Sequence, residues 1–239
     1  MAKKADEIAR VDAVVEAALL LFMERGYDNA PMSLLAGRLG LTKAGLYHHF
    51  DSKEDLLFVA HKTAMQRQLG PLFAAAENEP DPERRLRTFL HDYARMLALE
   101  PTAGLMIREA RRLSPGHLKE IKNTWRFGLD LVRGAIIELQ RSGRCRADVD
   151  PTFAAFAAIG MANWICYWFD PKRPNSADAV AKTIADLFMS GLTAGTIGRA
   201  AARGDTVVAS PRRTKQPRRA KQMSRAAKGE RTAQKRRTS

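Results

Sequence analysis

The sequence has little of the chemistry on which disulfide frameworks, metal sites and membrane spans depend. Only two cysteines, Cys145 and Cys166, occur among its 239 residues, and neither lies in a metal-ligand spacing. They predict free thiols in a reducing compartment. No apolar run reaches the roughly 18 residues of a membrane span, and the charged start at residues 1–4 is not followed by the apolar region of a signal peptide. We therefore expect a cytoplasmic protein with no membrane contact.

Sequence patterns typical of catalysis are also missing. The chain has no phosphate-cradling glycine loop, no His-Glu-x-x-His spacing and no nucleophile elbow. His48 and His49 are adjacent, so on a helix their side chains point about 100° apart, and no neighbouring carboxylate or cysteine completes a metal site. We expect no catalytic residue, no metal and no cofactor.

Positive charge is abundant but unevenly distributed. The chain has 40 lysines and arginines against 26 aspartates and glutamates, a net charge of +14. Residues 203–239 alone hold 13 basic and 2 acidic residues, whereas the other 202 residues have a net charge of only +3. After Val208 this segment has almost no apolar residue larger than alanine, so it predicts a disordered basic tail. Such a tail can neutralise DNA phosphates of any sequence, or it can serve solubility alone.

Helical periodicity dominates the rest of the chain, and alternating strand patterns are nearly absent. The sequence predicts an all-α fold of about nine helices, with a small three-helix domain over residues 1–52, a larger helical domain over 53–202 and the tail over 203–239. Gly70-Pro71 is expected to bend or break the fourth helix. Helices are expected over residues 6–25, 32–39, 43–49, from 52 onward, 82–98, 104–113, 115–141, 152–169 and 176–197.

The segment 35–50 carries the most specific pattern of the chain. It predicts a short helix, a tight turn at Gly40, which can adopt the required positive φ, and a second short helix with Thr42 as its N-cap. Leu41 is expected to pack between the two helices. This arrangement is a helix-turn-helix, whose second helix enters the major groove of DNA.

Residues Ile8 to Leu57 resemble the DNA-binding domain of TetR-family transcriptional regulators. Pro31 departs from the hydroxyl residue more usual there, although proline fits a first helical turn. The landmarks are Ala17-Ala18, Leu21-Phe22, Gly26-Tyr27, Leu35-Ala36, Gly40-Leu41-Thr42-Lys43, Leu46-Tyr47-His48-His49-Phe50 and Ser52-Lys53-Glu54. The resemblance implies DNA contacts from Thr42, Lys43, Ala44, Gly45, Tyr47, His48 and Lys53. The spacing of Leu46 and Phe50 predicts that both face the core. The alternative is a helical hairpin whose polar residues are merely solvated.

Apolar residues recur at helical spacing over 153–169 and 176–197, with small residues that allow close helix approach. In TetR-like proteins the last two long helices of each subunit form a four-helix dimer interface, so the resemblance implies a homodimer through these segments. A dimer would present two recognition helices about 34–36 Å apart. The alternative is that both stripes belong to the core of a monomer.

The segment Asn163-Trp164…Tyr167-Trp168-Phe169-Asp170-Pro171, followed by Asp186-Leu187-Phe188, resembles a subgroup of TetR-like regulators that respond to acyl-CoA or other CoA thioesters. It implies a hydrophobic effector. Met106, Trp125, Trp164 and Trp168 are candidates to line its cavity and Arg108 to meet a CoA phosphate, although aromatic stripes are more often core. We therefore expect a ligand-released homodimeric repressor that binds double-stranded operator DNA. The alternatives are a sequence-nonspecific nucleoid-type DNA binder driven by the tail, and a helical small-molecule enzyme, for which no residue constellation exists.

Overall fold

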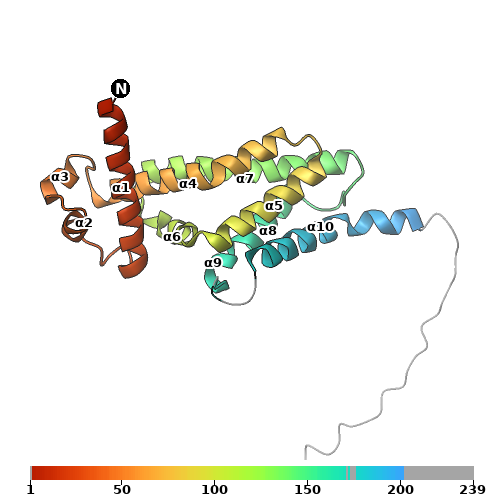
Figure 1. Ribbon diagram of the computed structural model, residues 1–239. Coiled ribbons are helices and arrows are strands. Elements are labelled where there is room, and N and C mark those ends of the chain that lie inside the picture. The colour runs from red at the N-terminus through yellow and green to blue at the C-terminus, as the bar shows by residue number, and fades with distance from the viewer. Residues whose placement is uncertain (1, 171, 173–175, 202–239) are drawn as a thin grey trace, which may run out of the picture. The chain divides into compact units, whose positions relative to one another are not determined.

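The computed structural model describes residues 2–170, 172 and 176–201, and side chains from Val11 to Thr193 within that range. The predicted basic tail lies outside the described residues. Within them the chain forms ten α-helices, one 3-10 helix and no strand, which confirms the all-α fold (Figure 1). The elements are α1 (Ala2–Arg25), α2 (Met32–Arg38), α3 (Lys43–Tyr47), α4 (Lys53–Asn78), α5 (Pro82–Leu99), α6 (Pro101–Glu109), η1 (Ala110–Arg112), α7 (Pro115–Arg141), α8 (Pro151–Asn163), α9 (Ile165–Trp168) and α10 (Ala177–Ala201).

Side-chain caps fix the helix starts that the sequence predicts. Thr42 Oγ1 accepts from the backbone N–H of Gly45 at 3.0 Å, and Ser52 Oγ accepts from that of Asp55 at 2.9 Å. Asp150 caps α8 in the same way. Each cap satisfies a backbone donor that the first helical turn leaves without a partner. The boundaries of α3, α4 and α8 therefore follow from local chemistry.

The expected break at Gly70-Pro71 is wrong, because α4 runs through Pro71 without interruption. A proline inside a helix removes one hydrogen bond and crowds the preceding turn, at a cost of about 3 kcal/mol. The turns that follow it carry Leu72, Phe73 and Ala76, all packed into a core cluster formed by α4, α5, α7, α8 and α10. Tertiary packing of this apolar face outweighs the local penalty and keeps the helix continuous.

The helix expected over residues 152–169 is instead divided into α8 and the single turn α9. Trp164 ends α8 and precedes α9. Ile165 is fully buried in the third core cluster, whereas Trp164 remains 63% exposed. The aliphatic side chain thus faces inward and the large aromatic one outward, as adjacent residues with helical backbone angles can do.

Three clusters of buried residues give the molecule its organisation, and the third of them joins α5, α6, α8, α9 and α10. The first joins α1 to α4 with residues of α6 and the start of α7, so the helix-turn-helix packs directly on the body. The second lies among α4, α5, α7, α8 and α10, with α5 in contact with the four others. The helices of the body therefore surround α5.

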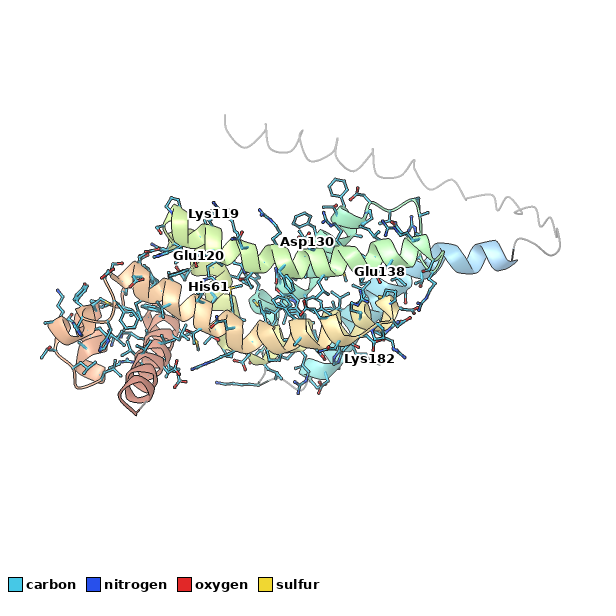
Figure 2. All side chains as sticks on the ribbon, turned by 90° about the horizontal axis from the view of Figure 1, so that it is seen from above. His61, Lys119, Glu120, Asp130, Glu138 and Lys182 are labelled. Carbon is cyan, nitrogen blue, oxygen red and sulfur yellow. The ribbon has the colours of Figure 1, made fainter. Side chains whose placement is uncertain are left out.

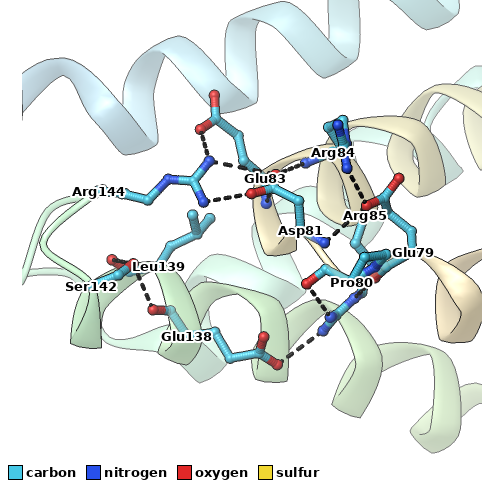
Figure 3. A network of polar contacts seen from close by, with 10 residues as sticks. All are labelled: Glu79, Pro80, Asp81, Glu83, Arg84, Arg85, Glu138, Leu139, Ser142 and Arg144. Atoms are coloured by element: carbon cyan, nitrogen blue, oxygen red, sulfur yellow. Dashed lines mark hydrogen bonds and ion pairs between the residues drawn. The ribbon is translucent and has the colours of Figure 1, made fainter.

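An ionic network joins the start of α5 to the end of α7 and to the loop that follows α7 (Figure 3). Arg144 contacts Asp81 at 2.6 Å and Glu83 at 2.7 Å, while Arg85 contacts Glu138 on α7 at 2.9 Å. The hydrogen bond from Arg144 lowers the pKa of Asp81 to about 2. Asp81 is also the N-cap of α5, so one carboxylate holds both a helix start and the loop after α7.

Candidate functional site

The helix-turn-helix forms as the sequence predicts. Gly40 adopts a φ of +65°, which places it in the left-handed region that favours glycine. Leu46 and Phe50 are buried in the first core cluster, so their predicted inward orientation is confirmed. Leu41 was expected to pack between the two helices, but its side chain is 41% exposed. The turn is instead closed by backbone, with the N–H of Leu41 donating to Ala36 O at 2.9 Å.

The outward face of α3 presents a small, polar and positively charged surface. Its exposed residues are Thr42, Lys43, Ala44, Tyr47 and His48, and Gly45 is half-buried beside the Thr42 hydroxyl. Lys43 Nζ lies 5.8 Å from the centre of the Tyr47 ring. The structure therefore brings together six of the seven residues predicted to contact DNA, with no bulky side chain on Ala44 or Gly45 to hold a duplex away.

Lys53 lies apart from this surface. Its ammonium donates to the carbonyl oxygen of Tyr27 and sits 4.4 Å from the centre of the Tyr27 ring. Burial lowers the pKa of Lys53, although the nearby Asp28 carboxylate opposes that change. The side chain thus stabilises the α1–α2 connection. For a phosphate, Lys53 can still offer its backbone N–H at the start of α4.

A polar contact ties the start of α4 to the start of α7. Glu54 Oε1 accepts from the backbone N–H of Ser114 at 2.6 Å and lies 3.0 Å from Nδ1 of His117. The His117 ring also stacks on Phe58, with centroids 3.9 Å apart. Burial alone would raise the pKa of Glu54, but the hydrogen bonds from Ser114 and His117 outweigh it and lower the pKa. The helix that leaves the helix-turn-helix is therefore fixed to α7.

A cavity of about 580 Å³ lies in the body, between α4, α5, α6, α7 and α8. Its wall is mostly apolar and aromatic, and a hydrogen bond of 2.6 Å from Tyr93 Oη to Asn163 Oδ1 interrupts that wall. Gly128 allows the close approach of α7, since a Cβ there would lie 3.2 Å from the Phe73 ring. The lining residues are Leu69, Phe73, Phe89, Tyr93, Ile107, Lys122, Thr124, Trp125, Arg126, Gly128, Leu129, Phe156, Ile159, Gly160 and Asn163. A cavity of this size and lining suits an apolar ligand of modest length.

Cations mark the opening of this cavity. Lys122 and Arg126 are exposed residues that also line it, and both border a shallower hollow that includes Lys119. The three positions are spaced to share one face of α7; Figure 2 labels Lys119 on the outer side of that helix. In the described part of the chain none of the three forms an ion pair, so their charges are free to meet an anion.

Only one of the five ligand-binding residues predicted from sequence, Trp125, lines the cavity. Met106 is buried in the first core cluster, and Arg108 borders a separate small hollow beside Cys166. Trp164 and Trp168 are 63% and 48% exposed on the surface. Trp164 and Trp168 therefore do not form the pocket wall, although Asn163 of the same segment and Phe156 of the preceding stripe do. Other wall residues, such as Phe73 and Tyr93, come from helices that helical periodicity alone does not bring together.

The last helices of the body leave an uncovered apolar surface. Phe153 and Phe156 on α8 are 75% and 58% exposed, and Leu187 on α10 is 62% exposed. The alternative of a pure monomer core leaves these side chains unexplained, because large exposed apolar patches usually mark association sites. They belong to the two segments predicted to form a dimer interface.

Other classes of site find no support in the described residues. No group of three or more histidine, cysteine or acidic side chains is arranged to hold a metal ion there. None of the helices within that range is long and apolar enough to cross a bilayer. Cys145 and Cys166 are free thiols, as predicted.

Comparison with known proteins agrees with this architecture. Residues 14–60 match the family "Bacterial regulatory proteins, tetR family", and residues 79–192 match "Tetracyclin repressor-like, C-terminal domain". The HTH-type transcriptional repressor KstR2 of Rhodococcus jostii is 24% identical over 185 residues, which span 75% of this chain and 89% of that protein.

Solved structures extend the likeness to the whole helical body. The TetR family transcriptional regulator PfmR from Thermus thermophilus is 31% identical, with a TM-score of 0.67 over 74% of this chain and 96% of its own. AibR, solved with isovaleryl coenzyme A and operator DNA, is 27% identical, with a TM-score of 0.66 over 77% of this chain and 98% of its own. The chain therefore belongs to the TetR family and is a DNA-binding transcriptional regulator.

Proposed function

We propose that this regulator is a homodimeric repressor that a CoA thioester releases from its operator. The observation that carries the proposal is the apolar cavity of about 580 Å³ with Lys122 and Arg126 at its opening. The interior suits an acyl chain, and cations suit the phosphates of coenzyme A. AibR, a relative of similar fold, was solved with isovaleryl coenzyme A and operator DNA, which supports the same pairing of effector and target here.

On the DNA side, the exposed face of α3 enters the major groove. Thr42, Lys43, Ala44, Gly45, Tyr47 and His48 make the contacts, and the backbone N–H of Lys53 binds a phosphate at the start of α4. A single α3 reads few base pairs, so two copies, joined through α8 and α10, bind half-sites about one helical turn apart. The exposed Phe153, Phe156 and Leu187 are the apolar side chains that such a dimer buries.

Release follows from the position of α7, which contributes to both the cavity wall and the contact with α4. Effector binding favours a position of α7 that, through Glu54, turns the start of α4 and moves the two α3 helices out of register with the operator. The effector must bind this state better than the DNA-competent one, since equal affinity shifts no population.

The test begins with selection of genomic fragments that the dimer binds, followed by affinity measurements on the best fragment. At physiological salt a regulator keeps a preference of about 10³ or more over random DNA. A panel of CoA thioesters of increasing acyl length is then titrated into the complex. We expect release by at least one member. A preference near one would favour a nonspecific DNA binder, and release only by uncharged hydrophobes would refute the CoA thioester.

A further inference from the structure

One half-buried polar pair interrupts the apolar wall of the cavity. Tyr93 Oη donates to Asn163 Oδ1 at 2.6 Å, and both residues line the hollow. Burial strongly raises the pKa of the Tyr93 phenol, so it remains a donor at physiological pH. The hydrogen bond therefore fixes the orientation of the Asn163 amide, with the carbonyl toward Tyr93.

This orientation leaves the other half of the amide without a partner. Asn163 Nδ2 carries two donor hydrogens, and no group in the described part of the chain accepts from it. The amide is half-buried in the cavity wall, so Nδ2 is free to donate to a ligand that supplies an acceptor. The cavity thus offers one amide donor to an oxygen atom of a ligand.

This donor lines the same cavity as the two exposed cations and a row of aromatic rings. Tyr93 stacks on Phe89, with centroids 5.8 Å apart, and Phe89 stacks on Phe73 at 6.1 Å. The three rings give the cavity wall a row of apolar surface, while Lys122 and Arg126 are exposed. A ligand with its anionic head at the two cations and its apolar chain along the rings has its head–chain junction beside Asn163.

In a CoA thioester this junction is the thioester carbonyl. We propose that Asn163 Nδ2 donates a hydrogen bond to that carbonyl oxygen, and that Tyr93 acts as a positioning residue by holding the amide in place. The inference rests on the proposed function and adds to it a selection for an acyl group over an alkyl group. Neither the apolar wall nor the charged rim can make that distinction.

A matched ligand pair tests the proposal: an acyl-CoA, and the S-alkyl-CoA thioether of equal chain length that lacks only the carbonyl oxygen. Binding of both to the full-length dimer is measured by calorimetry. We expect the wild type to bind the thioester about three- to tenfold more tightly, the worth of one neutral hydrogen bond. Equal affinities would overturn the role of Asn163 while leaving a CoA effector intact, whereas no binding of either would overturn the proposed effector itself.

Variants assign the preference to the pair. Asn163→Leu, similar in volume, should remove the preference, and Tyr93→Phe should reduce it while the affinity for the thioether stays unchanged. Thr88→Val removes an exposed hydroxyl of α5 that lies outside the cavity wall and should keep the full preference. Thermal melting checks that each variant is folded. A preference that persists in Asn163→Leu would contradict the proposal.

Discussion

Glu54 on α4 lies within hydrogen-bond distance of His117 on α7, 3.0 Å from its Nδ1, and accepts the backbone N–H of Ser114 at 2.6 Å. The first of these helices follows directly on the recognition helix, and the second lines the cavity. A displacement of α7 therefore also moves the start of α4, unless these hydrogen bonds break.

Glu54→Ala should consequently weaken the response to effector more than it weakens DNA binding. Without the carboxylate, α7 can move while α4 stays in place. We expect the effector-induced loss of operator affinity to shrink by about threefold or more, within the range of measured coupling energies. The measurement is operator affinity with and without a saturating CoA thioester.

Glu120→Ala provides the matched control. It cuts another contact between α4 and α7, the 3.4 Å ion pair with Lys62, whose side chains are about half exposed. Exposed pairs contribute little, so the response to effector should stay at the wild-type level. An equal effect of both variants would show that Glu54 is not a specific link.

Lys43→Ala and Tyr47→Ala should each weaken operator binding by about tenfold, the worth of one charge-assisted contact. Both side chains are exposed, so the melting temperature should not change. For Lys43→Ala the slope of log affinity against log salt should also fall by about 0.9. Leu46→Ala, at a fully buried position, should instead destabilise the protein by about 2–5 kcal/mol. Wild-type affinity in both surface variants would refute the assignment of α3 as recognition helix.

The helix-turn-helix could be predicted in detail because its determinants are local. Gly40 and Thr42 act within a few residues of themselves, and the spacing of Leu46 and Phe50 determines their orientation. Leu41 was misjudged because its exposure depends on how α2 and α3 cross rather than on local pattern. Pro71 shows the converse, in that a local helix breaker lies inside a continuous helix that tertiary packing stabilises.

Leu187→Asp should dissociate the dimer. The exposed apolar surface of α8 and α10 would then carry a charge without a partner in an interface that excludes water. Leu20 on α1 is similarly exposed, at 55% against 62% for Leu187, so Leu20→Asp is the matched control and should remain dimeric. Sedimentation at micromolar concentration distinguishes the two. A monomeric wild type would contradict the dimer directly.

His61 predicts a distinct dependence of stability on pH. Its side chain lies fully buried on α4 beside Trp125, and Nδ1 has no hydrogen-bond partner (Figure 2). Burial lowers the pKa of folded His61 to about 4, from 6.5. Because the unfolded chain then binds the proton more readily, acidification below pH 6.5 favours unfolding until the pH reaches about 4. Above pH 6.5 the effect vanishes.

The loss assigned to His61 amounts to about 3 kcal/mol at most, at roughly 1.4 kcal/mol for each pH unit. Urea unfolding of the wild type and of His61→Leu between pH 7 and pH 4 measures it, since the carboxylates contribute equally to both proteins. The wild type should lose more stability than the variant over this interval. Parallel curves would mean that His61 is hydrated in the folded state.

The cavity was largely beyond the reach of sequence reasoning. Its wall combines residues of five helices, and a periodic apolar stripe does not reveal where packing leaves a hollow. Trp164 and Trp168 have the composition of a ligand pocket but face outward, whereas Tyr93 and Asn163 have no sequence signal that joins them across α5 and α8. Trp125 was found because it is aromatic, and its side chain lines the cavity while remaining 37% exposed.

The central claim, that the rim of this cavity receives the phosphates of a CoA thioester, is tested most directly on Lys122 and Arg126. We measure the acyl-CoA concentration that half-releases the operator for the wild type, for Lys122→Gln with Arg126→Gln, and for Arg133→Gln. The last variant neutralises a cation on the same helix that borders neither hollow. The double variant should need about tenfold more acyl-CoA, as expected for loss of charge-assisted contacts, while Arg133→Gln matches the wild type. Unchanged release by the double variant would contradict the account.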